Sequence, residues 1–134
     1  MAEEMPEPLT PAEWKVMKIV WRHKQCAARD VYKEAGRLFG WAPTTAKSVL
    51  RRLVEKGHLT AEQIGNSFLY RPAPAVVRSS LLRAADALLD NLLEGTTGQV
   101  LSHLVRKSRL SAKELTELRD ILDRCQTGEE KEED

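Results

Sequence analysis

Apolar residues recur at helical spacing between residues 41 and 53, the most informative stretch of the chain. If this stretch forms one helix entered through Pro43, successive side chains are about 100° apart around its axis. One side of that helix then carries Ala46, Val49, Leu50, Leu53 and Val54. Because these positions follow the i, i+3, i+4, i+7, i+8 pattern, we expect this side to face a core.

The opposite side of the same helix carries short hydroxyl groups between cations: Thr44, Thr45, Lys47, Ser48, Arg51 and Arg52. Hydroxyls hydrogen-bond base edges, whereas arginine and lysine reach guanine or phosphate. A solvated surface helix also carries such residues, so the face alone does not decide between the two interpretations. The neighbouring elements add weight to the DNA-binding one.

A two-stranded hairpin is predicted after this helix. Lys56 and Gly57 are typical of a helix C-terminus, where a cation and a left-handed glycine are favoured. Extended stretches at 58–63 and 67–70 flank the turn formers Gly65 and Asn66, and Pro72 closes the second strand. Phe68 and Tyr70 are expected on one face of this ribbon.

Two further helices are predicted upstream. Thr10, Pro11 and Glu13 form the pattern of a capping box with proline at the first helical position. The expected core stripe of this first helix is Trp14, Met17, Val20 and Trp21. A second helix is predicted at 29–39 and ends at Gly40, with Val31, Ala35 and Leu38 inward. Three helices followed by a hairpin is the element order of a winged helix-turn-helix.

The remaining sequence predicts three amphipathic helices with more apolar surface than they can bury alone. The segment 76–93 is rich in leucine, 100–105 follows a turn bracketed by glycines, and Ser111 with Glu114 repeats the capping box before 115–122. Such a small core is marginal, and an identical copy would bury the surplus. The expected dimerisation residues are Leu81, Leu82, Ala85, Leu88, Leu89, Leu92, Leu101, Leu104, Leu118, Ile121 and Leu122.

The predicted architecture is therefore mainly α with a small β-hairpin wing: a winged helix-turn-helix followed by a three-helix C-terminal dimerisation domain. We expect a disordered N-terminal arm at 1–8, a DNA-binding domain at 9–73, a dimerisation domain at 74–126 and a disordered acidic tail at 127–134.

Charge is divided in the same way along the chain. The net charge is +1, but residues 13–78 hold thirteen Lys or Arg against five Asp or Glu, whereas residues 79–134 hold eight against twelve. A basic winged helix suits a polyanionic partner. With no apolar run long enough to span a membrane and no signal-peptide pattern, we expect a cytoplasmic protein without membrane insertion.

Enzymatic and metal chemistry have little support in the sequence. Cys26 and Cys125 are far apart and form no CxxC motif, and the three histidines show no ligand spacing with a cysteine or carboxylate. No serine stands in a nucleophile elbow. We therefore expect no catalytic residues, no metal site, no cofactor and no enzyme activity.

These residues resemble the penicillinase repressor family, the BlaI/MecI-type regulators, over residues 9–122. The resemblance is carried by Leu9-Thr10-Pro11-Ala12-Glu13-Trp14-Lys15-Val16-Met17, by Trp41-Ala42-Pro43 with Thr45, Arg52-Leu53 and Lys56-Gly57, by Tyr70-Arg71-Pro72, and by Leu110-Ser111-Ala112-Lys113-Glu114-Leu115. It implies a transcriptional repressor that binds a palindromic operator in double-stranded DNA as a homodimer.

The resemblance also assigns roles to single residues. Thr44, Thr45 and Ser48 match positions that face bases, and the implied backbone contacts are Lys47, Arg51, Arg52, Asn66 and Ser67. Three positions depart from the family pattern. Ala42 replaces a capping serine, which costs about 0.5–2 kcal/mol at a helix start, Thr44 replaces a longer polar side chain, and Asn66 replaces an arginine that would bind phosphate.

For release from DNA, the resemblance implies cleavage in the C-terminal half through a membrane sensor metalloprotease system, with Asn91 and Leu92 in the matching region. Otherwise these two residues are simply the last residues of a helix. Two other functions stay open: a ligand-sensing winged-helix regulator, which needs a polar pocket, and a winged-helix module that binds protein without reading DNA.

Overall fold

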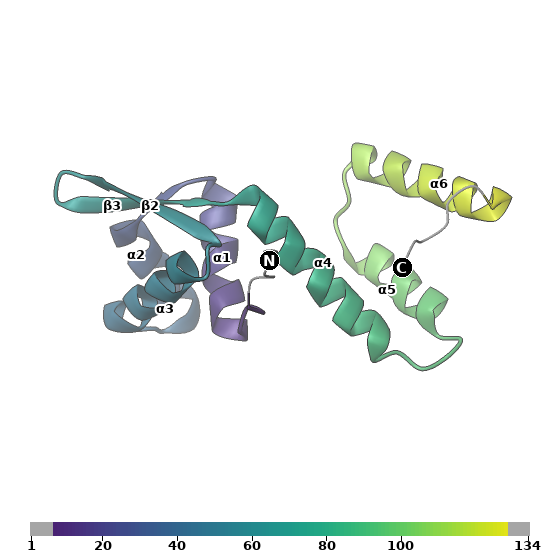
Figure 1. Cartoon of the computed structure of the whole chain (residues 1–134), viewed down its shortest axis with the longest axis horizontal. Helices are drawn as coiled ribbons and strands as arrows, with labels where there is room; N and C mark the ends of the chain where they lie inside the picture. The colour runs from purple at the N-terminus through teal and green to yellow at the C-terminus, as the bar shows by residue number, and fades with distance from the viewer. Residues whose placement is uncertain (1–6, 129–134) are drawn as a thin grey trace, which may run out of the picture. The chain divides into compact units, whose positions relative to one another are not determined.

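The computed structural model describes residues 7–128, and these divide into two compact units after Asp90 (Figure 1). The first unit holds α1 (Pro11–His23), β1 (Cys26–Ala27), α2 (Ala28–Phe39), α3 (Pro43–Glu55), β2 (Leu59–Ile64), β3 (Ser67–Pro72) and α4 (Pro74–Asp90). The second holds α5 (Thr97–Lys107) and α6 (Ala112–Thr127). The predicted fold class, mainly helical with a winged helix-turn-helix, is confirmed.

Local signals in the sequence set the helix boundaries of the first unit. The hydroxyl of Thr10 accepts a hydrogen bond from the Glu13 amide, and the Glu13 carboxylate accepts one from the Thr10 amide, so the predicted capping box forms. Gly40 ends α2 with a φ of 73°, a left-handed conformation that suits glycine. Both boundaries confirm the sequence prediction.

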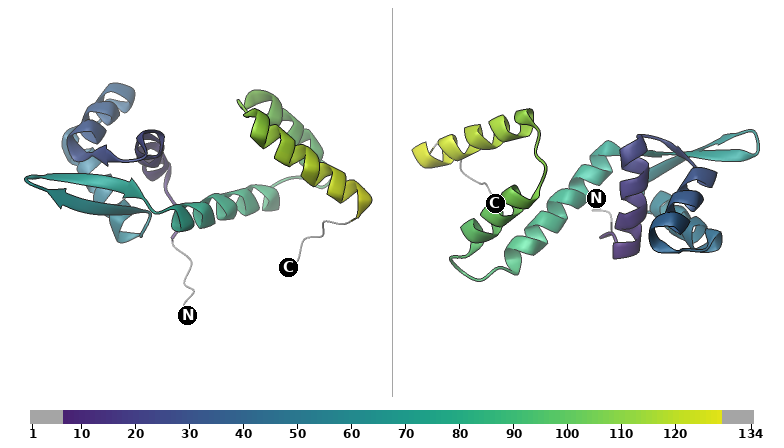
Figure 2. Two further views of the ribbon diagram at one scale, coloured as in Figure 1. Left: turned by 90° about the horizontal axis from the view of Figure 1, so that it is seen from above. Right: turned by 180° about the vertical axis from the view of Figure 1, so that it is seen from behind.

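The small sheet has one strand more than the sequence predicted. Its order is β1-β3-β2 and all pairings are antiparallel, with Cys26 opposite Tyr70 and Ala61 opposite Tyr70 on the other side. The hairpin of β2 and β3 projects beyond the helices of its unit (Figure 2). β1 has only two residues, which is too short for an alternating pattern, so it was missed.

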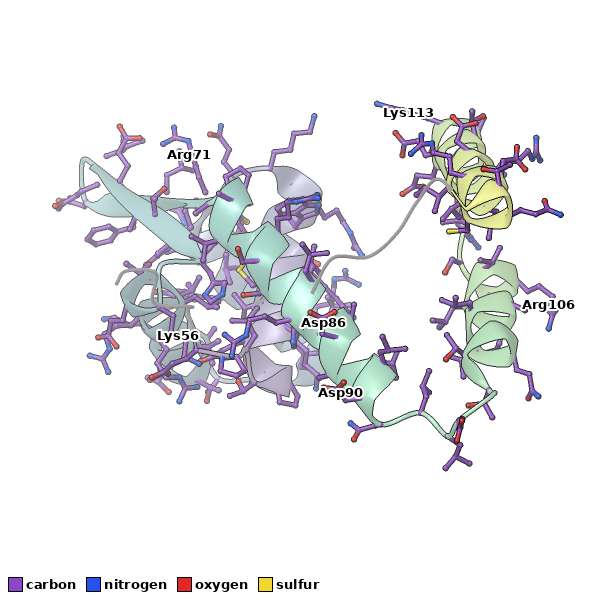
Figure 3. The ribbon with its side chains drawn as sticks, turned by 45° about the vertical axis from the view of Figure 1, so that its right-hand side comes forward. Lys56, Arg71, Asp86, Asp90, Arg106 and Lys113 are labelled. Atoms are coloured by element: carbon purple, nitrogen blue, oxygen red, sulfur yellow. The ribbon has the colours of Figure 1, made fainter. Side chains whose placement is uncertain are left out.

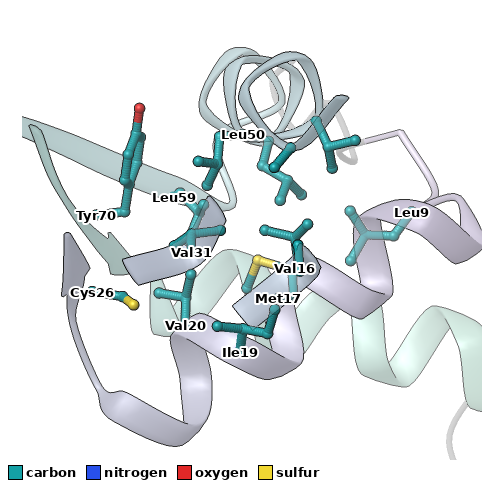
Figure 4. Close-up of a cluster of buried hydrophobic side chains, with 14 of the residues drawn as sticks. Leu9, Val16, Met17, Ile19, Val20, Cys26, Val31, Leu50, Leu59 and Tyr70 are labelled. Atoms are coloured by element: carbon teal, nitrogen blue, oxygen red, sulfur yellow. The ribbon is translucent and has the colours of Figure 1, made fainter. Parts of the chain in front are cut away.

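A single core fills the space between α1, α2, α3 and the base of the hairpin (Figure 4). Leu50, Leu53 and Leu59 are its largest fully buried apolar side chains. The expected core positions Trp21 and Leu38 are wrong, because they are 50% and 45% exposed. In α1 the buried side extends instead to Val16 and Ile19, which lie well around the helix from Trp21.

Helix α4 packs on the winged helix, whereas the sequence assigned it to the C-terminal half from residue 74. Its Val77 and Ser80 are buried, and the Ser80 hydroxyl shares a 2.6 Å hydrogen bond with Nε2 of the fully buried His58. The His58 carbonyl also accepts a hydrogen bond from the Ala73 amide at 2.9 Å. His58 thus joins the end of α3 to the start of α4, and the compact unit extends to Asp90.

We expect His58 to make folding sensitive to mild acid. Burial lowers the pKa of His58 below its usual 6.5, with a contribution from the charge of Lys56 and opposition from Glu13. Below pH 6.5 the unfolded chain takes up a proton that the folded chain excludes, so stability is lost as the pH falls. Urea unfolding between about pH 7.5 and 5.5 should show this loss in the wild type and less of it in His58→Gln.

His23→Gln is the matched control, because His23 is exposed in the first unit. An unfolding midpoint that falls equally in the wild type and in His58→Gln would assign the acid sensitivity to another group.

The second unit leaves most of its apolar side chains exposed. Ser111 forms the predicted capping box with Glu114, and α6 ends at Gly128 with a φ of 82°. No described residue of α5 or α6 is buried, and Leu101, Leu104 and Leu122 are 56%, 42% and 67% exposed. Figure 3 shows Arg106 on α5 and Lys113 on α6 as exposed cations of this unit. These helices therefore have no core of their own in a single chain.

Three predicted boundaries are corrected near the chain ends and after α4. α4 stops at Asp90, so Leu92 and Leu93 lie in the connection that follows and not in the helix. Thr127, assigned to the tail, is the last residue of α6, and Pro8, assigned to the arm, accepts a hydrogen bond from Lys56. The rest of the predicted arm and tail, at 1–6 and 129–134, lies outside the described residues. Within 7–128, no helix is both long and apolar enough to cross a lipid bilayer.

Candidate nucleic-acid interface

Helix α3 presents six of the eight side chains that the sequence proposed for DNA contact. Proline at the first helical position starts α3 without a side-chain cap, since Ala42 has no hydrogen-bonding group. Ala46, Val49, Leu50 and Leu53 are buried against the core, which fixes the rotation of the helix. The exposed residues on its other side are Thr44, Thr45, Lys47, Ser48, Arg51 and Arg52.

The exposed arc of α3 divides into three strips by helical rotation. At about 100° per residue, Lys47 and Arg51 lie at one border of the arc, next to Val54. Thr44 and Ser48 lie near its middle, and Thr45 and Arg52 lie at the opposite border. The hydroxyls at the helix start are therefore flanked by cations, as in a recognition helix whose first residues contact base edges.

A groove separates α3 from the hairpin on the Lys47 and Arg51 side. We call it the wing groove; it has a volume of about 310 Å³, and its lining residues are Lys47, Ser48, Arg51, Val54, Glu55, Ala61, Phe68 and Tyr70. Tyr70 and Phe68 share a face of the ribbon, as predicted, with ring centroids 6.5 Å apart. The sequence did not predict the groove, because it depends on how the hairpin packs beside α3.

Arg52 differs from Arg51 because its guanidinium is paired with a carboxylate of the same chain. Its Nε lies 3.5 Å from Oε2 of Glu13, at the start of α1. Lys56 Nζ lies 2.7 Å from the other carboxylate oxygen of Glu13 and also donates to the Pro8 carbonyl at 3.1 Å. The Glu13 carboxylate is almost fully buried, at 1% exposure. Two cations and the Thr10 amide offset the cost of burying its negative charge.

The Glu13 carboxyl group is ionised at neutral pH. Burial acts to raise the pKa of Glu13, but hydrogen bonds from Lys56 and the Thr10 amide, together with the charges of Lys56 and Arg52, hold it below the usual 4.5. The sequence identified Glu13 only as a helix cap. Its role in joining α1 to α3 was missed, because its partners lie about forty residues away along the chain.

The turn of the hairpin is exposed and carries the two residues proposed for DNA backbone contact. Gly65 has a φ of 63° and Asn66 follows it, so that Ile64 pairs with Ser67 across a two-residue turn. Both Asn66 and Ser67 are exposed. Neither lines the wing groove, so their proposed contacts belong to the wing tip.

Arg71 is held on the opposite face of the ribbon. Its guanidinium donates to Glu62 at 2.7 Å and to Gln25 at 3.0 Å, and Figure 3 labels it on the hairpin. The face turned toward α3 therefore takes its positive charge from α3 itself and not from the strands.

The two cysteines lie apart from the α3 face, and only one of them is buried. Burial, aided by the charges of Asp30 and Glu34, raises the pKa of the Cys26 thiol, which keeps it protonated and unreactive. Cys125 is exposed on α6. Among residues 7–128, no three His, Cys, Asp or Glu side chains gather in an arrangement that could hold a metal ion.

The family model and the two relatives that match this chain all represent one family of repressors. The family model described as "Penicillinase repressor" matches residues 9–124. The chain is 29% identical to the penicillinase repressor of Bacillus licheniformis, over 86% of this chain and 89% of that protein. It is 27% identical to the methicillin resistance regulatory protein MecI of Staphylococcus aureus, over 87% of this chain and 94% of that protein.

Among solved structures, the chain is similar to the monomeric form of Bacillus licheniformis BlaI in complex with the blaP half-operator. The identity is 35%, with a TM-score of 0.46, over 52% of this chain and 83% of that chain.

Proposed function

Since this chain belongs to the penicillinase repressor family, it is a DNA-binding transcriptional repressor, and we propose that it binds a palindromic operator as a homodimer. Repression by DNA binding is not an enzymatic role. The observation that carries the proposal is the exposed face of α3, where hydroxyls at the helix start are flanked by Lys47 and Arg51. This face is held outward by a fully buried apolar stripe on the other side.

In this proposal, the side chains of α3 divide the task of binding. Thr44, Thr45 and Ser48 contact base edges and set the sequence preference, because a major groove presents donors and acceptors that differ for each base pair. Lys47 and Arg51 contact phosphates. These contacts position the winged helix, which we call the head, on the DNA and supply most of the affinity. Arg52 contributes less to DNA, since Glu13 holds its guanidinium. Asn66 and Ser67 contact the backbone at the wing tip.

The exposed leucines support a homodimer. On α4, Leu81, Leu82, Leu88 and Leu89 are between 46% and 54% exposed. Clusters of half-exposed leucines on one helix of a soluble protein are typical of protein interfaces. A second copy is the proposed partner, because two heads related by a twofold axis fit an operator with two inverted half-sites. The remaining proposed interface residues are Ala85, Leu92, Leu101, Leu104, Leu118, Ile121 and Leu122.

Release by proteolysis fits the place of Asn91 and Leu92. They lie in the connection between α4 and α5, directly after the boundary of the first unit, and Asn91 is exposed. Exposed connections are the usual sites of proteolytic cleavage. We propose that a membrane sensor metalloprotease system causes this cleavage in the cytoplasm. Mass spectrometry of the chain from induced cells tests it: intact chain under full induction would contradict this part of the proposal.

We expect Arg51→Ala and Thr44→Ala to weaken binding in different ways. Loss of the Arg51 charge should lower affinity for all duplexes and reduce the slope of log affinity against log salt by about one for each bound head. Loss of the Thr44 hydroxyl should change sequence preference and leave the slope unchanged. Both are measured by fluorescence anisotropy on a duplex selected by the wild type from a random pool and on a random duplex.

Arg71→Ala is the matched control, since it removes the same charge from the ribbon face that is turned away from α3. Salt-insensitive binding by the wild type, or none, would favour a winged helix that binds protein. Equal losses for Arg51→Ala and Arg71→Ala would show that α3 does not direct the binding.

A further inference from the structure

The wing groove contains an exposed aromatic ring beside the cations proposed to bind phosphate, and none of the proposed base and phosphate contacts uses that ring. Phe68 is 43% exposed, whereas its neighbour Tyr70 is 9% exposed and belongs to the core. The two rings lie 6.5 Å apart, within the range of favourable aromatic pairs, so Tyr70 supports the ring of Phe68 from the base of the ribbon. Phe68 is thereby fixed in place with much of its surface in water.

Charge along the groove is uneven. Lys47 and Arg51 line one part of it, and Glu55 lines it two turns after Lys47, at the end of α3 that leads into β2. Lys47 and Glu55 are eight residues apart, which is about 12 Å along the helix. An anion is therefore attracted at the Lys47 end of the groove and repelled at the Glu55 end. The part of the groove that attracts phosphate is therefore the part away from the base of the hairpin.

We propose that the wing groove holds one sugar–phosphate strand of the DNA, with Phe68 packed on its deoxyribose and Lys47 and Arg51 on its phosphates. This inference rests on the proposed function. A nucleic-acid strand alternates between charged phosphate oxygens and the apolar C–H surface of the sugar, and the groove offers cations and an aromatic ring to match. Phenylalanine has neither donor nor acceptor, so Phe68 binds the strand whatever its base sequence.

Ile64 provides the matched control on the same ribbon. It is 55% exposed, which is more than Phe68, but it pairs with Ser67 on the opposite face and does not line the groove. If any exposed apolar side chain on the hairpin strengthened binding, the two substitutions would act alike. The proposed geometry requires that they differ.

The test compares the full-length wild type with Phe68→Ala, Ile64→Ala and Lys47→Ala on two duplexes, a selected operator and a random sequence, over a range of salt. We expect Phe68→Ala to lower affinity about tenfold on both duplexes at every salt concentration, the loss expected when an aromatic side chain no longer leaves water on binding. Its salt slope should equal that of the wild type, whereas Lys47→Ala should have a lower slope. Ile64→Ala should stay within about twofold of the wild type.

Hydroxyl-radical cleavage reads the sugar directly, because the radical attacks deoxyribose hydrogens. The wild type should protect sugars beside the wing, and both Phe68→Ala and the more conservative Phe68→Leu should lose part of that protection. A Phe68→Ala affinity equal to that of Ile64→Ala, or a loss confined to the selected operator, would overturn the inference while leaving DNA binding intact. Absence of wild-type binding to either duplex would instead reject the proposed function.

Discussion

Replacing Leu89 by Asp is expected to lower affinity for a palindromic operator by about 10²–10⁴-fold while binding to a single half-site stays close to that of the wild type. Leu89 is 54% exposed on α4, so a charge there does not disturb the core of its own chain. In the proposed dimer the same carboxylate would be buried against a second copy without a partner. Loss of the dimer removes the effective concentration that the first bound head gives to the second, which accounts for the size of the effect.

Sedimentation velocity measures the assembly and anisotropy on full and half operators measures the binding. Leu89→Met, which keeps an apolar side chain of similar volume, should remain a dimer with wild-type affinity. A Leu89→Asp chain that sediments as a dimer would show that α4 does not form the interface, even if operator binding were reduced.

Replacing Glu13 by Ala is expected to destabilise the winged helix by about 2–4 kcal/mol, the largest effect we anticipate for a single polar side chain. The substitution removes the half of the capping box in which the Glu13 carboxylate accepts from the Thr10 amide, and it leaves Lys56, whose side chain is only 16% exposed, without its main counter-charge. Arg52 loses the same partner. Urea unfolding followed by circular dichroism measures the change, and Glu34→Ala is the control, because the exposed Glu34–Arg37 pair has the same kind of contact at 2.8 Å.

The difference between the wild type and Glu13→Ala should depend on pH in a defined direction. Because the pKa of Glu13 is lower in the folded chain than its usual 4.5, its contribution is complete above that pH and is lost as the pH falls through the folded value. This window lies below the one expected for His58, which begins near pH 6.5. A double variant Glu13→Ala/Lys56→Met should recover part of the stability, since it no longer leaves a mostly buried cation without its nearest counter-charge.

Elements defined by neighbouring residues were predictable from the sequence. The capping boxes at Thr10 and Ser111 and the left-handed Gly40 depend on contacts within a few residues, so a short pattern is sufficient to identify them. The inward face of α3 was predictable for the same reason, because a repeat of four buried positions fixes the rotation of a helix.

Long-range pairings were not predictable in the same way. Cys26 and Ala27 form a strand only because β3 is adjacent to accept them, and a two-residue segment has no periodicity to detect. His58 was expected to begin a strand, but it is buried between α3 and α4, where it contacts Ser80. Trp21 and Leu38 were expected to face the core because they are apolar. The other buried residues of their helices fix the rotation of each helix, and at that rotation both side chains are exposed.

The sequence by itself determined the family, the order of the helices and the polar face of α3, because each is written in contiguous residues. Only the tertiary structure decided that Arg52 is paired with Glu13 while Arg51 lines a groove with Phe68, and that α4 packs on the winged helix. The physical reason is that the charge pairing and the exposure of a side chain depend on which residues surround it in the folded chain. Two arginines adjacent in the sequence point about 100° apart on a helix, and what they meet there is supplied by distant segments of the chain.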